Sequence, residues 1–518
     1  MISRPYSDPV LSSREAIEFE GKFFGGDEKC EWMAMSQAGA AIAKQVALDI
    51  QETLGEEPMK RLLVLVGKGH NGGDALIAAR HLLTRYSGAE AFMVFPFGMS
   101  RIRPLVKRSL DDLQSAAGYR LKYLSLRASG IGAQMGGFCA DEVFDLCLDG
   151  MLGMQFQPPV RAPARALIQW VNNYSRIRCR VAVDVPSGVG DSSDDVSFRA
   201  DFSYATGIAK SGLFSLDNKA AVGRIRYLDL GFFDGCDIET KSTIVAERVM
   251  GFRRRLRGSA VHKKSFGHLF VVGGSSTMPG AILMTVRSAL MSGVGLVTAF
   301  VPESIVAAAA VHLPEAMWVG LPEIPDDGGL ALEGISQVRA LAKGATGWAI
   351  GPGVGRHPET ATLIEEILKL SSVPVLLDAD ALQAKLVASI VSKRSAVITP
   401  HAGEFNRLND RPLNEPIDVD RVKAFAEVQQ KVVLLKGAHT LITDGVCAIF
   451  STCGGPVLAR GGSGDILSGL IGGRISIPNT DFIESIVEGA TWHGWAADRL
   501  ARVSGQNSCK TTDILSFL

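Results

Sequence analysis

The sequence carries no excess of charge of either sign. Lysine plus arginine and aspartate plus glutamate both total 54, so the formal net charge is zero. Nucleic acids and anionic membranes attract strongly basic chains, and neither is therefore expected as the main partner. An anionic ligand would have to be held by a local site.

Closely spaced cysteines and long apolar runs are also absent. The cysteines stand at positions 30, 139, 147, 179, 236, 447, 453 and 509 and include no CxxC pair, which speaks against a zinc site or a disulfide scaffold. No signal-peptide core opens the chain, and no apolar run reaches the roughly 18 residues of a spanning helix. We expect reduced thiols and a cytoplasmic location.

What the chain does have is length and ordinary composition. Its 518 residues are 47% hydrophobic and 21% charged, which is close to the usual composition of folded soluble proteins. A single hydrophobic core rarely serves more than about 300 residues, so we expect two domains.

The first half repeats one local pattern of apolar run, glycine turn and helical periodicity. Residues 61–66 form a short apolar run, residues 67–74 a glycine-rich turn, and residues 75–83 a helical pattern. Further apolar runs occupy residues 91–95, 143–148 and 180–185. This alternation predicts a doubly wound, mostly parallel sheet with helices on both faces.

Polar side chains follow several of these strands. Asn71 and Asp74 come after the first, Asp149 after a later one, and Asp184 with Ser187 after the next. Taken singly, Asn71 is typical of a turn, and Asp149 and Ser187 are typical of helix caps. Taken together, they meet at the edge where open α/β sheets bind ligands. The oxygen-only set Asn71, Asp149 and Ser187 favours a hard cation, and Asp184 could serve as an acid or a base.

These motifs resemble the NAD(P)H-hydrate epimerase domain. The resemblance rests on GxGxNGGD at residues 67–74, DGMLG at 149–153, DVPSG at 184–188 and the segment 201–210. It covers about residues 10–235, and we expect residues 1–235 to form a Rossmann-like, epimerase-like domain. The resemblance implies that Asp184 does acid and base work and that Asn71, Asp149 and Ser187 bind potassium. It also implies contacts to the hydrated dinucleotide from Asn71, Gly72, Gly73, Asp74, Gly153 and Asp184.

The chain departs from that family pattern at two places. Lys68, His70 and Ala75 replace the usual residues around the NNGGD loop, and Met154 and Gln155 stand where the family continues with Thr-Gly. A side chain at Gln155 would narrow the approach to the substrate phosphates. Lys68 is either a phosphate-binding cation that offsets this loss or an exposed lysine.

The alternation of strands and helices is interrupted between residues 233 and 258, where we place the domain boundary. The arginine cluster at residues 253–257 is more typical of a solvated helix face than of a nucleic-acid patch, because the net charge is zero. Strand-like segments that end in glycines or charges resume at residues 269, 295, 348, 373, 396 and 432.

The second half leads to a glycine-rich turn at residues 458–470. This stretch predicts the end of a strand, a tight turn at Gly461, Gly462 and Gly464, and a helix that begins near Asp465. The free N–H groups at such a helix start favour a phosphate group. Asp465 would accept the proton of a hydroxyl that attacks a phosphoryl group, or would simply cap the helix.

Six blocks fall in order through this half: HKxSFG, GGSxxMPGA, GPGxG, DADAL, TPHxGE with KGAxT, and GGSGD. Their series resembles the NAD(P)H-hydrate dehydratase family, and the resemblance implies a ribokinase-like fold over residues 245–518 with Asp465 as the base. It implies substrate contacts from Ala281, Gly353, His401 and Asp465. It implies nucleotide contacts from Lys436, Gly437, Ala438, His439, Thr440, Gly462, Ser463 and Gly464.

Three polar residues of these blocks keep a structural alternative. His401 follows a Thr-Pro step and is also typical of a turn residue with a satisfied ring. Asp378 and Asp380 are either caps or lysine-paired carboxylates, or they help to place magnesium beside nucleotide phosphates, a role that we favour for Asp380. Gln383 stands where the family usually has asparagine.

The two resemblances imply repair of hydrated NADH and NADPH. The C-terminal domain would dehydrate the S epimer with ADP or ATP as phosphoryl donor and Mg²⁺, and the N-terminal domain would interconvert the R and S epimers with K⁺. An alternative is a ribokinase-like small-molecule kinase with a non-catalytic N-terminal binding domain. We expect small-molecule partners and a homo-oligomer, while the sequence leaves open ADP against ATP and NADH against NADPH.

Overall fold

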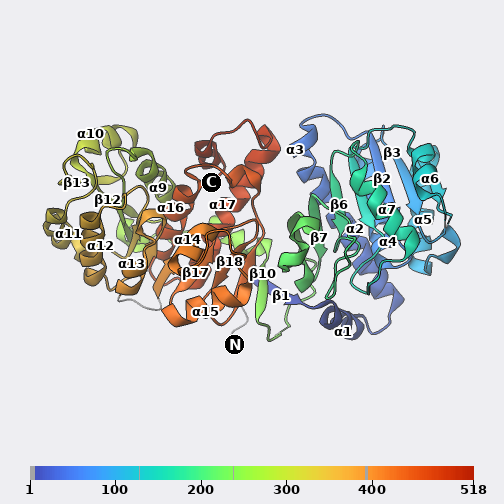
Figure 1. The fold of residues 1–518 in the computed structure, drawn as a ribbon, viewed down its shortest axis with the longest axis horizontal. Helices are drawn as coiled ribbons and strands as arrows, with labels where there is room; N and C mark the ends of the chain where they lie inside the picture. The colour runs from blue at the N-terminus through green and yellow to red at the C-terminus, as the bar shows by residue number, and fades with distance from the viewer. Residues whose placement is uncertain (1–5, 128, 237, 391–394) are drawn as a thin grey trace. The chain divides into compact units, whose positions relative to one another are not determined.

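The structure is a computed structural model that describes residues 6–127, 129–236, 238–390 and 395–518. The chain divides into two compact units (Figure 1). Unit 1 consists chiefly of residues 8–246 together with 501–508, and unit 2 consists chiefly of residues 247–500 together with 509–518.

Unit 1 is built on a seven-stranded sheet with the order β4-β3-β2-β5-β6-β7-β9. All of its strand pairs are parallel. The order reverses between β2 and β5, so the connections after these two strands leave toward opposite faces and open a crevice at the carboxyl edge. The strands of unit 1 are β1 (Ser7–Leu11), β2 (Arg61–Val66), β3 (Glu90–Phe95), β4 (Leu121–Ser125), β5 (Leu146–Gly150), β6 (Arg180–Val183), β7 (Phe202–Thr206), β8 (Ala209–Lys210), β9 (Arg224–Leu228) and β10 (Ser242–Val245).

Helices cover this sheet because its central strands are apolar on both faces. Every residue of β2 after Arg61 is buried, as expected of a strand in the middle of a parallel sheet. The helices of unit 1 are α1 (Ser13–Phe24), α2 (Glu28–Asp49), α3 (Gln51–Leu54), α4 (His70–Arg85), α5 (Pro104–Ala117), α6 (Ile131–Cys139), α7 (Ala162–Asn173) and α8 (Lys219–Val222).

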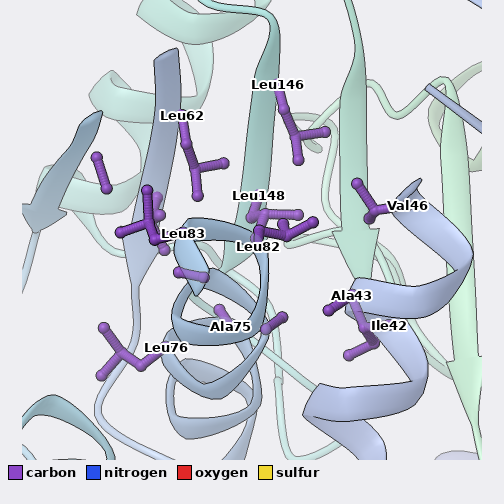
Figure 2. Close-up of a cluster of buried hydrophobic side chains, with 14 of the residues drawn as sticks. Ile42, Ala43, Val46, Leu62, Ala75, Leu76, Leu82, Leu83, Leu146 and Leu148 are labelled. Atoms are coloured by element: carbon purple, nitrogen blue, oxygen red, sulfur yellow. The ribbon is translucent and has the colours of Figure 1, made fainter. Parts of the chain in front are cut away.

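The helix α2 packs closely on α4 because small residues line its inner face. A Cβ atom at Gly39 would lie only 2.5 Å from the Cβ of Ile77, so a larger residue would force the two helices apart. Figure 2 shows the apolar cluster that α2, α4, β2 and β5 form on this side of the sheet, with Ile42, Leu82 and Leu148 among its members.

Unit 2 is built on strands in the order β13-β12-β11-β14-β15-β16-β17-β18-β19. The pairs are parallel up to β17, whereas β17, β18 and β19 pair in antiparallel fashion. The order reverses between β11 and β14. The strands are β11 (His268–Val272), β12 (Leu296–Pro302), β13 (Met317–Leu321), β14 (Gly347–Ile350), β15 (Val375–Leu377), β16 (Ala396–Ile398), β17 (Val432–Leu435), β18 (Thr440–Thr443) and β19 (Ala448–Ser451).

The helices of unit 2 include a buried pair, α9 and α16, that packs together beside the central strands. Gly469 of α16 makes this close approach possible, because a Cβ atom there would overlap the Oγ of Ser288 and the backbone of α9. The helices are α9 (Pro279–Met291), α10 (Glu303–His312), α11 (Ile335–Leu341), α12 (Pro358–Leu370), α13 (Ala384–Ser389), α14 (Ala402–Leu408), α15 (Val419–Gln429), α16 (Ser463–Ile475) and α17 (Phe482–Ser504).

The arginine cluster at residues 253–257, within the predicted boundary segment, is exposed, and part of it stacks on aromatic rings. Arg253 lies 5.1 Å from the ring centre of Trp492 and 4.4 Å from that of Trp495, and Arg257 lies 3.8 Å from that of Phe266. These contacts bind the cluster to unit 2 itself. Within the part of the chain that the structure describes, no helix combines the length and the apolar character needed to cross a bilayer.

Candidate active sites

The carboxyl edge of the unit 1 sheet opens into a cavity of about 520 Å³ at the crevice between β2 and β5. Its lining includes Asn71 and Asp74 of α4, Gly153 after β5, and Asp184 after β6. Sequence-distant residues that were predicted to share a site therefore do lie around one cavity.

The predicted glycine turn after β2 is shorter than expected, because α4 already begins at His70 rather than near Ala75. Gly72 and Gly73 belong to the first turn of this helix. A Cβ atom at Gly72 would overlap the carbonyl oxygen of Gly67, and one at Gly73 would overlap the Cε of Met35. Tight packing explains both glycines.

Asp149 and Ser187 are hydrogen-bonded to each other, and Leu152 links them to Asn71, because its N–H donates to Ser187 Oγ at 2.9 Å and its carbonyl oxygen accepts from Asn71. The Oγ of Ser187 donates to Asp149 Oδ1 at 2.7 Å and its backbone N–H donates to Oδ2 at 2.8 Å. The side-chain amide of Asn71 donates to the carbonyl oxygens of Leu152 and Val183 at 2.9 and 3.0 Å. Burial raises the pKa of Asp149 to about 6, although the bonds from Ser187 oppose this rise. The network ties the loops after β2, β5 and β6 together.

Asp184 is held in a strained conformation against a buried lysine. Its φ angle is 65°, which is rare for a residue other than glycine. Lys210 Nζ lies 2.5 Å from Asp184 Oδ1, and both side chains are buried. The N–H and Oγ1 of Thr206 also donate to Oδ1, each at 3.4 Å. Strain of this kind persists only where the surroundings enforce it and is common at functional sites.

Two further carboxyl groups line the same cavity. Asp74 is 8% exposed, and its Oδ1 has no hydrogen-bond partner. Burial, reinforced by Asp184 and Glu20, raises its pKa well above the usual value. Burial also raises the pKa of Glu20 to about 7, against the lowering effect of Lys210. Glu20 was missed by sequence reasoning, because no motif marks α1.

The residues that depart from the family pattern have definite places. Met154 packs on the apolar cluster that contains Leu11 and Phe232, while Gln155 lines the cavity. Lys68 also lines the cavity, and its Nζ lies 5.0 Å from the ring centre of Phe97.

In unit 2 the glycine-rich turn leads directly into α16. The helix begins at Ser463, two residues before the predicted start, and Gly462 caps it with a φ angle of 87°. A Cβ atom at Gly462 would overlap the Cε of Met284. The segment before the turn is a short 3-10 helix, Pro456–Leu458, and the prediction of a strand there was wrong. Asp465 lies in the first turn of α16.

Beside this helix start lies a buried ion-paired network. Lys436 Nζ donates to Asp378 Oδ1 at 2.8 Å, and Ser468 Oγ donates to Asp378 Oδ2 at 2.5 Å. A Cβ atom built on Gly464 would lie 3.4 Å from Lys436 Nζ, so this lysine is next to the helix start. Burial, with a further contribution from Asp378, raises the pKa of Asp465 to about 6, although Lys436 opposes the rise. A pKa raised in this way suits a general base.

The other predicted substrate residues belong to the carboxyl edge of the same sheet. A Cβ atom on Gly353 would lie 2.9 Å from the Cβ of Ala281, so these two residues are neighbours. His401 follows β16 and caps α14, where its Nδ1 accepts from the N–H groups of Gly403 and Glu404 at 3.0 and 3.3 Å. His401 is therefore a helix cap, and its side chain remains 56% exposed.

The remaining residues of the predicted nucleotide set lie around one turn. Lys436, Gly437, Ala438 and His439 connect the antiparallel strands β17 and β18, and Thr440 opens β18. Lys436 is joined to Pro400 by a backbone hydrogen bond of 2.8 Å, which brings this turn beside the segment of His401.

Asp380 and Gln383 are bonded to nearby groups. Asp380 pairs with Arg356 at 3.0 Å, and the amide of Gln383 donates to the backbone oxygen of Asp380 at 2.9 Å. His493 of α17 was missed: it is buried, its Nε2 has no hydrogen-bond partner, and burial together with Lys436 lowers its pKa to about 4. An isolated histidine in an apolar helix gives no signal in the sequence.

Two α/β units, each with acidic groups gathered at the carboxyl edge of a sheet, define a two-domain α/β enzyme. Residues 269–518 match the family model described as NAD(P)H-hydrate dehydratase, and residues 32–212 match the one described as YjeF-related protein N-terminus. The expected Rossmann-like and ribokinase-like fold classes are confirmed.

Curated relatives match over nearly the whole chain. The bifunctional NAD(P)H-hydrate repair enzyme Nnr of Moorella thermoacetica is 32% identical over 93% of this chain and 91% of its own length. The enzyme of the same name from Synechocystis is 30% identical over 96% of this chain and 91% of its own. The chain belongs to the family of bifunctional NAD(P)H-hydrate repair enzymes.

One solved structure is also similar to the second half. It is the ADP/ATP-dependent NAD(P)H-hydrate dehydratase from Bacillus subtilis co-crystallised with ATP and Mg²⁺, which is 26% identical and covers 51% of this chain and 91% of that chain with a TM-score of 0.44.

Proposed function

We propose that this chain repairs hydrated NADH and NADPH in two steps. Residues 245–518 would dehydrate the S epimer at the expense of ADP or ATP, and residues 1–235 would interconvert the R and S epimers. The observation that carries the proposal is the position of Asp465 in the first turn of α16, next to the ion pair of Lys436 and Asp378.

The dehydration needs a better leaving group than hydroxide. Asp465 accepts the proton of the ring hydroxyl while the hydroxyl oxygen attacks the terminal phosphorus of the nucleotide, whose bond to the bridging oxygen breaks. The phosphorylated oxygen then leaves as phosphate and the ring loses a proton from the neighbouring carbon, which restores the dihydropyridine. The pKa of Asp465, about 6, leaves the carboxylate mostly ionised at neutral pH and still basic enough to accept this proton.

The phosphate that moves would lie against the start of α16. Gly462 and Gly464 present N–H groups at the start of the helix, which are fixed before the reaction and would stabilise the charge that develops on the phosphoryl oxygens, whereas the N–H of Ser463 already donates to the carbonyl oxygen of Arg460 at 3.3 Å. Gly462 and Gly464 are partly exposed and have no side chain that would cover the backbone, while Ser463 between them is buried. Lys436 adds a positive charge beside Gly464.

The carboxylates of this site fit a magnesium ion carried by the nucleotide. Mg²⁺ is usually held by one or two carboxylates together with phosphates and water, and Asp380 is near enough to Asp465 to raise its pKa. When bound, the ion would neutralise charge between donor and acceptor. Asp380 is the residue that we assign to it, and its partner Arg356 would have to release it.

In unit 1 the proposed epimerisation centres on Asp184. Its ion pair with Lys210 fixes one carboxylate oxygen in the cavity. The potassium ion is proposed at Asn71, Asp149 and Ser187, whose donor atoms are the oxygens that a hard cation prefers. Because both oxygens of Asp149 already accept hydrogen bonds from the backbone or Ser187, the ion would share them and would stabilise the loops after β5 and β6.

The test uses the purified full chain and hydrated NADH as a mixture of epimers. With ADP or ATP present, absorbance of the reduced ring should appear, and chromatography that resolves the epimers should show both of them consumed. A small-molecule kinase would instead leave a stable phosphorylated product and no reduced ring. Consumption of the S epimer alone would refute the epimerase half, and a repeat without potassium would test the ion. Cytoplasmic location and homo-oligomerisation stay predictions.

A further inference from the structure

The cavity of unit 1 contains more carboxyl groups than its predicted chemistry uses. Glu20 of α1 lines it together with Asp74 and Asp184. The charged groups that face Glu20 are Lys210, Asp184 and Glu31, and Asp74 is coupled to Glu20 in turn. Glu31 has a partner of its own, since it lies 3.5 Å from the Nε2 of His70.

The three carboxyl groups nearest to Lys210 have different environments. Asp184 is ion-paired with that lysine at 2.5 Å. Asp74 is more than nine-tenths buried and has an unpartnered Oδ1, so a polar ligand atom in the cavity would satisfy it. Glu20 is half-buried, and the neutral form is favoured by burial near Asp184 and Glu31. One ion-paired carboxylate and one neutral carboxyl in the same cavity are the usual arrangement for acid and base catalysis.

The helix α1 carries Glu20 to the cavity beside an aromatic side chain. Phe24, one turn further along α1, lines the same cavity, and its ring lies 5.7 Å from that of Phe232, which also lines it. Glu18, two residues before Glu20, points elsewhere: it is exposed and pairs with Arg14 at 3.1 Å. The position of Glu20 is therefore specific to the cavity.

We propose that Glu20 is a catalytic acid and base of unit 1, which exchanges a proton with the hydroxyl group of the hydrated ring. The inference rests on the proposed epimerase function and adds a residue from outside its motifs. Hydration of an enamine places the hydroxyl on the carbon next to the ring nitrogen, so that the nitrogen lone pair can expel it.

In the first half of the reaction the Glu20 carboxyl gives its proton to the hydroxyl oxygen. The carbon–oxygen bond breaks, its electron pair leaves with the oxygen as water, and the nitrogen lone pair forms a carbon–nitrogen double bond. The resulting cation is stabilised by the carboxylates of Asp184 and Glu20. Water then adds to the opposite face of the carbon and returns one proton to Glu20, so atoms and charge balance over the cycle.

The experiment compares Glu20→Gln, Glu20→Asp and the control Glu18→Gln in the full chain. Epimer exchange is followed by chromatography between pH 5 and 9, and dehydration of the S epimer in the same samples reports on the integrity of the chain. Glu20→Gln should lower kcat for exchange by about 10²-fold or more, with a small change in KM, and should abolish the fall in rate above pH 7. Glu20→Asp should restore part of the rate, and Glu18→Gln should behave as wild type.

Two outcomes separate the inference from the function beneath it. If Glu20→Gln exchanged the epimers at the wild-type rate and with the wild-type pH profile, the role of Glu20 would be overturned while the epimerase function would stand. Failure of the wild-type chain to exchange the epimers at all would overturn both. A rate lost equally in Glu20→Gln and Glu20→Asp, with an unaltered pH profile, would mark Glu20 as structural and also overturn the proposal.

Discussion

Replacement of Asp465 by asparagine removes one proton acceptor and one half-buried negative charge from the site at α16. General base catalysis typically contributes 10²–10⁴-fold to a rate, so dehydration of the S epimer should slow by about 10³-fold, which corresponds to about 4 kcal/mol of activation free energy. The asparagine side chain has nearly the same size, and the N–H groups at Gly462 and Gly464 remain. Nucleotide affinity should therefore change little.

The same substitution should stabilise the fold at high pH. Burial raises the pKa of Asp465 from 3.8 to about 6, so the carboxyl group destabilises the folded chain increasingly as the pH rises through that interval. At 1.4 kcal/mol for each tenfold change, the ionised group costs at most about 3 kcal/mol. Asp465→Asn should gain up to this amount at pH 8, or several degrees in Tm, and the gain should shrink as the pH falls toward 5.

The matched control is Asp420→Asn, which removes an exposed aspartate from the first turn of another helix, α15. Both variants lose the same favourable interaction with a helix N-terminus, but only Asp465 is half-buried and close to other acids, Asp378 and Asp380. The rates come from absorbance of the reduced ring, and the stabilities from scanning calorimetry at pH 8 and pH 5. Turnover retained in Asp465→Asn, or lower stability than Asp420→Asn at pH 8, would refute the assigned base.

Two further substitutions test the packing that supports each site. Asp184→Asn leaves Lys210 buried without its carboxylate and should destabilise unit 1 by about 3–5 kcal/mol. The double variant Asp184→Asn/Lys210→Met should regain stability but should not exchange the epimers. Thermal unfolding distinguishes the two variants. Gly462→Ala combines a positive φ with an overlap on Met284 and should cost about 1–3 kcal/mol, while Gly461→Ala, with open space around it, should cost less in the same melts.

Strands were the most predictable elements, because they are short apolar runs between polar or glycine boundaries. The run at residues 61–66 coincides with β2. Polar residues at the strand ends were also predictable in kind, since a parallel sheet brings its carboxyl ends together at one edge.

The two errors have different physical causes. Glycines normally signal a turn, yet Gly72 and Gly73 lie inside α4 because neighbouring atoms leave no room for a Cβ there. Tertiary packing overrides the local propensity in such a case. The segment before the second glycine turn was predicted as a strand because it is a short apolar run, but such a run also suits a 3-10 turn, and here only Val457 is buried.

Residues that reach a site from a distant element were invisible. Glu20 lies on a helix whose sequence alternates charges and aromatics like any surface helix. Only the fold shows that the carboxyl group of Glu20 lines the cavity. His493 is equally silent, because its interaction with Lys436 joins two elements far apart in the chain. Local patterns predict what a segment can do, and the topology decides which segments act together.

The two proposed proton-transfer groups imply different pH profiles for the two epimers. Dehydration requires Asp465 to be ionised, so repair of the S epimer should rise with pH through about 6 and then level off. Repair of the R epimer also requires protonated Glu20, and the exchange step should therefore slow above about pH 7, by about tenfold for each further pH unit. The R epimer should accordingly be repaired fastest between pH 6 and 7, after subtraction of any exchange without enzyme.

The variant Glu20→Gln should lose repair of the R epimer, while its pH profile for the S epimer remains that of wild type. If both epimers followed one curve up to pH 9 in the wild-type chain, either the acid would not be Glu20 or exchange would never limit repair, and stopped-flow measurement of exchange alone would decide between them.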